Sequence, residues 1–312
     1  MGPAPARLFM HRSFAAWLLG SSGRLALPWR AALVTACFGA LSPLGLSPFA
    51  VFAGAIPVLF LLKRNVAGAL AIIAVAASAQ ATVLLSARQP FSLTLLFIAL
   101  MYLVPAGLAA VLIRYGSLNF CFQLAVLAGA LVLVGVHAVL AEPAAVWERA
   151  LHEMVNSLSA AGIKVDEGAV VSSLAHSMWG SCVALWLLTA LSALFVGRWW
   201  QSLLESPGGF GREYRELHVG VILGIAATAI LAGALLTNWP VIDACAWVAM
   251  TALAFQGLAA AHRCKVNGRL TRGWLAAVYV LLIIPLSAFV MVLVLAAWGF
   301  VDNFLKLKAR AA

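Results

Sequence analysis

Charged residues are scarce in this sequence: Asp, Glu, Lys and Arg make up 10% of its 312 residues, whereas apolar residues make up 64%. A soluble domain carries roughly a quarter of its residues as these four charged types, so the composition excludes a soluble fold. Apolar runs of about 20 residues have the length that crosses a hydrocarbon core about 30 Å thick. Transmembrane β-strands alternate apolar and polar residues over about 10 positions, and these runs do not. We therefore expect an all-α fold, a polytopic transmembrane helical bundle.

Motifs for catalysis and metal binding are also lacking. The five cysteines are scattered without a C-x-x-C pair, which argues against a redox motif or a zinc site. The chain contains no P-loop, no H-E-x-x-H pattern and no G-x-S-x-G pattern. We therefore expect no enzyme activity, no catalytic residue, no metal and no cofactor.

The net charge of +10 indicates membrane orientation, because Lys and Arg concentrate in the cytoplasmic loops of membrane proteins. We expect no nucleic-acid partner. With the N-terminus inside and nine segments, 14 of the 20 bases fall on the inner side. The nine predicted segments lie near residues 31–44, 47–62, 66–86, 91–113, 119–141, 172–197, 219–238, 241–261 and 275–300.

The first and last segments need a separate argument. No charge interrupts residues 31–62, but Pro43 and Pro48 end one helix and begin another, giving two thin crossings or one broken helix. A single crossing would divide the bases evenly between the two sides, so we prefer two. At the other end, one segment over 275–300 places the following tail outside. Re-entry of the chain around Pro285 would return that tail to the inside.

Outside the spans we expect an N-terminal cytoplasmic or interfacial part, residues 1–30, followed by a single transmembrane domain, residues 31–312. The N-terminal part is either an amphipathic helix on the membrane surface or a basic tail. The outer loop 142–169 has apolar residues at helical spacing, which predicts an amphipathic helix on the outer surface. That helix would be a lid over a cavity or a simple connector.

Two surfaces are candidates for contact with a partner protein. The inner loop 198–218 combines an apolar stretch, a Pro-Gly turn and a charged stretch, and it would either dock a cytoplasmic partner or only turn the chain. Its candidate contact residues are Pro207, Gly208, Gly209, Tyr214 and Arg215. The small residues Ala32, Ala36 and Ala40 form a row that would admit a partner subunit or another helix of the same chain.

Polar residues within spans are the remaining signal, because each is costly in lipid unless it is paired or lines a wet cavity. The predicted topology places five of them toward the outer half, as a candidate ligand-binding pocket: Gln80, His137, His176, Asn238 and Asp243. Each also has a simpler interpretation, since a satisfied polar group near a helix end is commoner than a ligand-binding one.

The chain resembles the YybS-like family of uncharacterised bacterial integral membrane proteins. The resemblance is carried by Arg198-Trp199-Trp200-Gln201, Pro207-Gly208-Gly209-Phe210, Glu213-Tyr214-Arg215, Gly257-Leu258-Ala259, Arg272-Gly273-Trp274 and Gly299-Phe300-Val301-Asp302. That family is distantly similar to the substrate-capturing S components of energy-coupling-factor transporters. The resemblance implies a bacterial cytoplasmic membrane, and a coupling protein that contacts the small-residue row of the first helix. The chain departs from the S components by having more than their usual six crossings.

These observations favour a membrane protein that binds or transports a small solute and works with a separate energising partner. The alternatives are a scaffold or regulator that recruits a partner through the 198–218 loop, and an intramembrane enzyme acting on lipid. The expected partners are membrane lipid, a small-molecule solute and a cytoplasmic or membrane coupling protein.

Overall fold

The computed structural model describes residues 6–20, 28–44, 47–162 and 167–311. Over these ranges the chain forms helices and no strand, which confirms the all-α fold class. Six of the described helical stretches are long and apolar enough to cross a membrane, so this is a multi-pass membrane protein. They are Val66–Ser86, Phe91–Tyr115, Leu118–Val139, Val171–Glu205, Pro240–Val266 and Ser287–Leu305. The other apolar helices are shorter, and nine full crossings are not confirmed.

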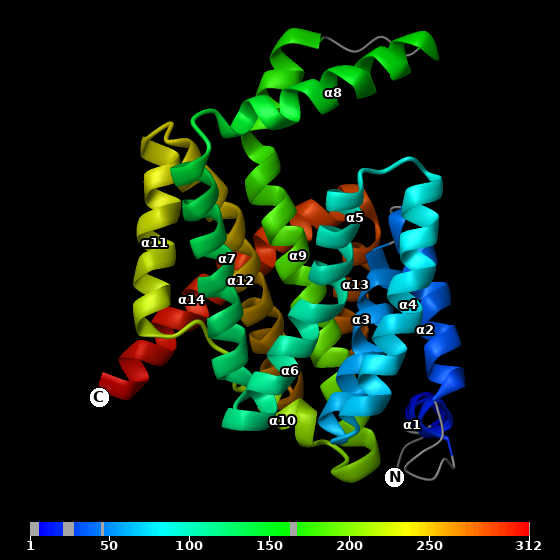
Figure 1. The fold of residues 1–312 in the computed structure, drawn as a ribbon. Helices are drawn as coiled ribbons and strands as arrows, with labels where there is room; N and C mark the ends of the chain where they lie inside the picture. Colours follow the sequence, from blue (N-terminus) through cyan, green and yellow to red (C-terminus); the bar gives the residue numbers. More distant parts are fainter. Residues whose placement is uncertain (1–5, 21–27, 45–46, 163–166, 312) are drawn as a thin grey trace. The chain divides into compact units, whose positions relative to one another are not determined.

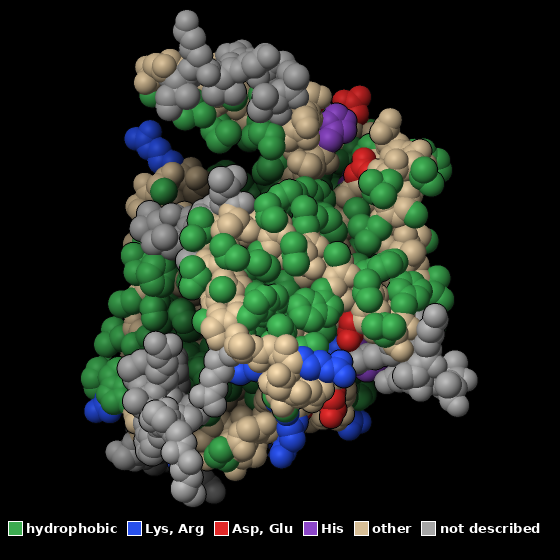
Figure 2. Space-filling view, turned by 180° about the vertical axis from the view of Figure 1, so that it is seen from behind, with side chains coloured by type: hydrophobic (Ala, Val, Ile, Leu, Met, Phe, Trp, Pro, Cys, Tyr) green, Lys and Arg blue, Asp and Glu red, His purple; other side chains and the backbone are tan. Residues whose placement is uncertain are grey.

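Apolar side chains cover much of the visible surface (Figure 2). Leu70, Phe91, Ile222, Leu235 and Val280 are all more than half exposed. In water such a surface would drive association, whereas lipid tails are as apolar as these side chains. The exposure pattern thus agrees with a chain that spends most of its length in a bilayer.

The helices pack into two compact units. Figure 1 colours the chain by residue number, so that the helices of each unit can be found by their labels. Unit 1 comprises residues 1–121 and 188–214, and unit 2 comprises residues 122–187 and 215–312. The long helix α9 (Glu167–Glu205) contributes its first part to unit 2 and its second part to unit 1. The other elements of unit 1 are α1 (Ala6–Leu19), α2 (Trp29–Leu41), the 3-10 turn η1 (Ser42–Leu44), α3 (Ser47–Leu62), α4 (Val66–Ser86), α5 (Phe91–Ile98), the π-helical turn η2 (Ala99–Leu103), α6 (Val104–Tyr115) and α10 (Gly209–Arg215). Those of unit 2 are α7 (Leu118–Val139), α8 (Pro143–Ala160), α11 (Val221–Leu236), α12 (Pro240–Val266), α13 (Arg272–Ile283) and α14 (Pro285–Ala311).

Small residues bring α2 close to α4 in unit 1. Ala32, Thr35 and Gly39 are buried on α2, and Ala69 and Ala76 are buried on α4. Small side chains let the two helix backbones approach closely. Close packing is important in lipid, because the hydrophobic effect does not drive helices together there. The Thr35 hydroxyl donates to the Ala31 carbonyl at 2.7 Å, so this close contact leaves its polar group satisfied.

The predicted break between the first two segments is confirmed. Helix α2 ends at Leu41 and η1 follows, with the Ser42 hydroxyl donating to the Gly39 carbonyl at 2.8 Å. Helix α3 then begins at Ser47. The N-terminal part also contains a helix, α1, whose Ala15 and Leu18 are buried beside Trp200. Its placement at the membrane surface remains a prediction.

The amphipathic helix predicted in the outer loop is α8. Its Leu151 and Val155 are buried against Val171 and Ala175 of α9, which accounts for the apolar spacing. The Trp179 indole donates to the Pro143 carbonyl at 2.9 Å and ties the two helices together at the start of α8. The outer-surface location and the lid role of α8 remain predictions. Helix α9 extends beyond the predicted segment 172–197 at both ends, and after residue 197 it continues for two more helical turns, to Glu205.

The last predicted segment, 275–300, is wrong as a single helix. The chain breaks before Pro285, which cannot donate a backbone hydrogen bond, and this separates α13 from α14. Helices α12 and α14 run parallel: Trp247 packs near Phe289, and further along both helices Arg263 pairs with Asp302. Helix α13 therefore leads the chain back between them. With 12 residues it is about 18 Å long, too short for a full crossing.

Candidate functional site

The two histidines of the predicted pocket are each bound to their own helix. His137 Nδ1 lies 2.9 Å from the Leu133 carbonyl, and His176 Nδ1 lies 2.8 Å from the Ser172 carbonyl. In both cases the ring nitrogen contacts the carbonyl four residues earlier, so the imidazole is folded back along its own helix. The His176 side chain is also exposed. These contacts fit the simpler interpretation, a satisfied polar group near a helix end.

Asn238 and Asp243 lie at the start of α12 in unit 2. Asn238 is exposed in the extended segment before the helix, and Asp243 is half-buried in the first helical turn, where a carboxylate is favoured by the helix dipole. Among the described residues, no hydrogen bond or ion pair joins His137, His176, Asn238 or Asp243 to another of the four. Their convergence on one pocket stays a prediction.

Gln80 differs from the other four because it is fully buried and belongs to a polar cluster of unit 1. Its amide Nε2 lies 3.1 Å from the Ser42 hydroxyl and 3.2 Å from the Met101 sulfur. The Ser42 hydroxyl in turn lies 3.5 Å from the same sulfur. We call Ser42, Gln80, Met101 and Tyr102 the Gln80 cluster; it joins η1, α4 and η2.

One end of the Gln80 amide is without a partner among the described residues: its Oε1 atom is buried and accepts no hydrogen bond from them. Exchanging the amide oxygen and nitrogen would not remove this imbalance, because only the other end faces Ser42 and Met101. A buried polar group without a partner costs about 1–3 kcal/mol. Such groups are rare enough in folded proteins to require an explanation, and one explanation is a ligand that completes the hydrogen bonding.

The Tyr102 hydroxyl is the second buried polar group of this cluster for which the described part of the chain provides no hydrogen-bond partner. Its oxygen lies against the Gly39 backbone, where any side chain on residue 39 would collide with it. Glycine at position 39 thus makes room for the tyrosine. The cluster carries amide, hydroxyl and thioether groups and no formal charge.

The π-helical turn that presents Met101 and Tyr102 follows from Pro105. Proline has no N–H to donate to the carbonyl of Met101 four residues earlier, and its ring crowds that carbonyl. The helix widens into the π-helical turn Ala99–Leu103 and then continues as α6. Gly54 of α3 faces the Met101 carbonyl, and a Cβ there would lie 3.2 Å from this oxygen. Single π-turns within helices are frequent at functional sites.

The candidate partner-contact residues are largely packed within unit 1. Ala32 is buried, and Ala36 and Ala40 are half-buried. In the inner loop, Pro207 and Gly208 are exposed, Gly209 and Tyr214 are buried, and Arg215 is half-buried. The Tyr214 ring packs edge-on against Phe195 and at a tilt against Phe210, with ring centres 5.5 and 5.6 Å away. The exposed residues of the loop are therefore the stretch from Glu205 to Gly208, together with Arg212 and Glu216.

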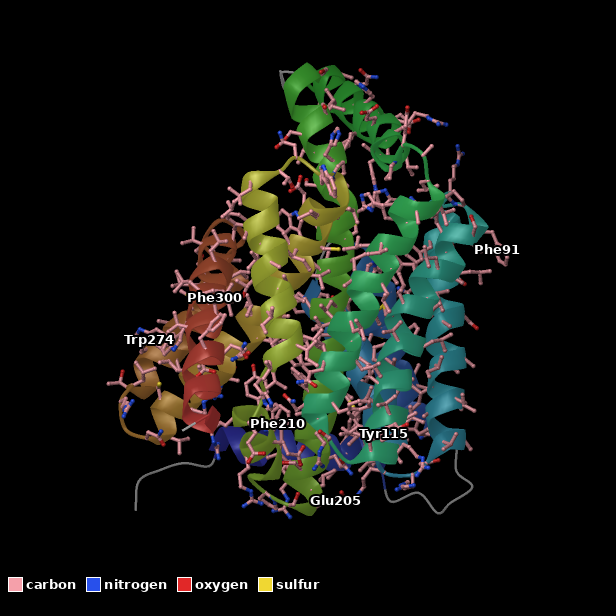
Figure 3. The ribbon with its side chains drawn as sticks, turned by 90° about the vertical axis from the view of Figure 1, so that its left-hand side faces the viewer. Phe91, Tyr115, Glu205, Phe210, Trp274 and Phe300 are labelled. Atoms are coloured by element: carbon pink, nitrogen blue, oxygen red, sulfur yellow. The ribbon has the colours of Figure 1, made fainter. Side chains whose placement is uncertain are left out.

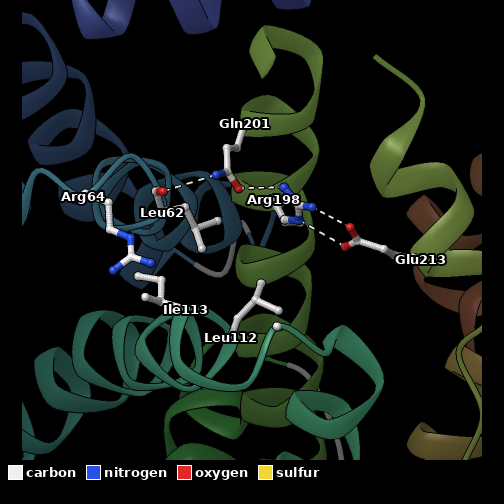
Figure 4. Close-up of a pocket in the computed structure, with 8 residues that line it drawn as sticks. Leu62, Arg64, Leu112, Ile113, Arg198, Gln201 and Glu213 are labelled. Carbon is white, nitrogen blue, oxygen red and sulfur yellow. Dashed lines mark hydrogen bonds and ion pairs between the residues drawn. The ribbon is translucent and has the colours of Figure 1, made fainter. Parts of the chain in front are cut away.

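A chain of polar contacts occupies one end of unit 1 (Figure 4). Arg198 Nε donates to Glu213 Oε2 at 3.1 Å and Nη2 pairs with Oε1, while Nη1 donates to Gln201 Oε1 at 2.8 Å. Gln201 Nε2 lies 2.9 Å from Glu205, whose other oxygen pairs with Lys63 at 2.7 Å. Figure 3 shows Glu205 and Phe210 at this end of the unit, with Tyr115 at the end of α6 and Phe91 at the opposite end of the same span.

A cavity of about 210 Å³ lies beside this chain of contacts. Its polar lining is Arg64, Arg198, Gln201 and Glu213, and Leu62, Leu112, Ile113 and Gly116 complete the wall. Sequence reasoning named Gln80 but missed the rest of its cluster and this cavity. Pro105 within the predicted span 91–113 was the available signal for the π-turn, whereas nothing in the sequence pairs residues 62–64 with residues 198–213.

Comparison of the chain with protein-family models, curated proteins and solved structures gave no match. The resemblance to the YybS-like family and to S components therefore stays a prediction.

Proposed function

We propose that this multi-pass membrane protein binds a small, uncharged polar solute at the Gln80 cluster of unit 1. The observation that carries the proposal is the buried Oε1 of Gln80, which has no hydrogen-bond partner among the described residues; the Tyr102 hydroxyl of the same cluster also has none. A solute with both donor and acceptor groups would satisfy both atoms. A charged solute is disfavoured, because the cluster offers no opposite charge to offset the cost of burying an ion in the membrane.

We further propose that the protein is the binding component of a transport system with a separate energising partner. Support comes from the sequence, which contains no P-loop, and from its resemblance to S components. The scaffold alternative has weaker support. Most of its candidate loop packs within unit 1, and Tyr214 is buried there.

The test is ligand-induced thermal stabilisation of the purified protein, screened against uncharged polar compounds such as sugars, nucleosides and amides. A compound that stabilises the parent should lose its effect in Gln80→Leu and weaken at least tenfold in Tyr102→Phe. Ser78→Ala is the matched control, since Ser78 is an exposed residue of α4 that bonds only its own helix. A stabilising compound that acts equally on the parent and on Gln80→Leu would contradict the site, and a screen without any stabilising compound would contradict the function.

A further inference from the structure

The cavity at the Arg198 end of unit 1 contains a cationic group that forms no ion pair with any acid of the described residues. Arg64 lines the cavity, and among the described residues its guanidinium forms no ion pair. Both acids nearby are already engaged: Glu213 holds Arg198 with both of its oxygens, and Glu205 holds Lys63 and Gln201. The three bases Lys63, Arg64 and Arg198 thus face two acids, and the surplus positive charge lies on Arg64.

The backbone fixes Arg64 in the turn between α3 and α4. Its φ of 62° lies in the left-handed region that favours glycine. The turn is closed by hydrogen bonds from the Arg64 amide to the Leu61 carbonyl at 2.8 Å and from the Asn65 amide to the Phe60 carbonyl at 3.0 Å. Arg88 has the same conformation, with a φ of 58°, at the other end of α4, so the conformation alone does not mark a site. Arg64 is distinguished by the cavity that it lines.

The walls of the cavity indicate the kind of anion that fits it. Figure 4 shows Arg64 next to Leu62 and Ile113, apart from the Arg198–Glu213 pair, and Leu62, Leu112 and Ile113 provide the apolar lining. A volume of about 210 Å³ holds roughly seven waters at about 30 Å³ each, enough for a tetrahedral oxyanion with part of its substituent. A guanidinium donates paired N–H groups that match phosphate oxygens.

The position of the cavity relative to the candidate spans points to lipid. The span Val66–Ser86 begins two residues after Arg64, and the span Phe91–Tyr115 ends next to Gly116. The cavity therefore lies at the depth where a span meets the headgroup layer, at the end of unit 1 that the basic residues predict to be cytoplasmic. Anionic phospholipids supply phosphate at this depth.

We propose that this cavity is a binding site for a phosphate group, contributed by an anionic phospholipid headgroup or by soluble phosphate, with Arg64 as its principal ligand. Leu62, Leu112 and Ile113 contact the apolar part of the lipid. Arg198 stays paired with Glu213 and shapes the site without carrying its surplus charge. This proposal is independent of the solute site at the Gln80 cluster.

The test compares Arg64→Gly with Arg88→Gly. Both substitutions remove one exposed arginine from a left-handed turn, and glycine favours that conformation, so both variants should fold at least as well as the parent. Delipidated protein in a neutral detergent is titrated with short-chain phosphatidylglycerol, short-chain phosphatidylcholine and inorganic phosphate, and binding is followed by calorimetry.

We expect Arg64→Gly to weaken phosphatidylglycerol binding at least tenfold, while Arg88→Gly leaves it within twofold of the parent. Loss of inorganic phosphate binding in Arg64→Gly alone would support the same site with a soluble source. Equal losses in the two variants, equal binding of the zwitterionic lipid in all proteins, or no binding of either phosphate source to the parent would overturn the proposal.

Discussion

Arg263 of α12 and Asp302 of α14 form an ion pair in which Nη2 contacts Oδ1, and each side chain is less than a quarter exposed. The pair belongs to a wider set of contacts. Asp302 Oδ2 accepts from Gln256 Nε2 at 3.0 Å, Gln256 Oε1 accepts from the Val219 amide at 2.8 Å, and Arg263 Nη1 donates to the Arg215 carbonyl. The contacts hold the C-terminal halves of α12 and α14 on the segment that precedes α11.

Replacing Asp302 by Asn should therefore destabilise unit 2. The substitution leaves the Arg263 charge partly buried without its carboxylate, and we expect a loss of about 2 kcal/mol in unfolding free energy, seen as a lower melting temperature in detergent. Adding Arg263→Gln should recover part of the loss, because the two effects share one contact. Glu216→Gln, an exposed acid in the same unit, is the control. If Asp302→Asn melts like that control, the pair contributes nothing.

The close contact between α12 and α14 depends on two glycines. A Cβ on Gly257 would overlap the Leu295 carbonyl, and one on Gly299 would overlap the Leu253 carbonyl. Because both obstacles are backbone atoms, either alanine substitution should force the helices apart and cost about 3 kcal/mol or more. Gly135→Ala on α7 should be neutral or slightly stabilising, since no neighbouring atom of the described residues lies within 4 Å of its new Cβ. Normal melting of Gly257→Ala would contradict this packing.

The parallel course of α12 and α14 predicts the side of the C-terminus. Since the candidate spans Pro240–Val266 and Ser287–Leu305 both end close after the Arg263–Asp302 pair, the tail and the 267–271 loop should lie on the same side of the membrane. In the predicted orientation this moves Lys306, Lys308 and Arg310 inside and raises the inner count to 17 of 20 bases. A fluorescent protein and a periplasmic phosphatase, each fused at the C-terminus and inserted in the loop, should report one side for both positions. Opposite sides would contradict the parallel arrangement.

Gln80→Leu should raise stability while it removes solute binding. Leucine eliminates the unpaired Oε1, and the Ser42 hydroxyl keeps its bond to the Gly39 carbonyl. We expect a gain of about 1 kcal/mol in the free protein, measured by thermal unfolding without added compound. A clear loss of stability would show that the Ser42 and Met101 contacts of Gln80 outweigh its unpaired atom, and would assign the residue to folding.

The sequence alone established the class of the protein and several of its breaks. A chain with 10% charged residues cannot cover itself with polar surface, so its helices must face lipid. The break at Pro43 and Pro48 was also readable, because a proline acts on its own backbone. By the same local logic Pro285 indicated a break. The count of basic residues did not decide whether the chain breaks there, since the three bases of the C-terminal tail can be placed on either side of the membrane.

The tertiary structure decided which polar residues share a site. Side chains far apart in the sequence meet only when helices pack, and no composition or spacing encodes those meetings. Gln80 was identified as a polar residue in a span, but only packing brought it to Ser42 and Met101 and left its Oε1 without a partner. Arg64 looked like one of many basic residues at a helix end. In the folded chain Glu205 pairs with Lys63 and Glu213 pairs with Arg198, which leaves the positive charge of Arg64 in surplus. The sequence does not show this, because ion pairing depends on distances in space and not on order along the chain.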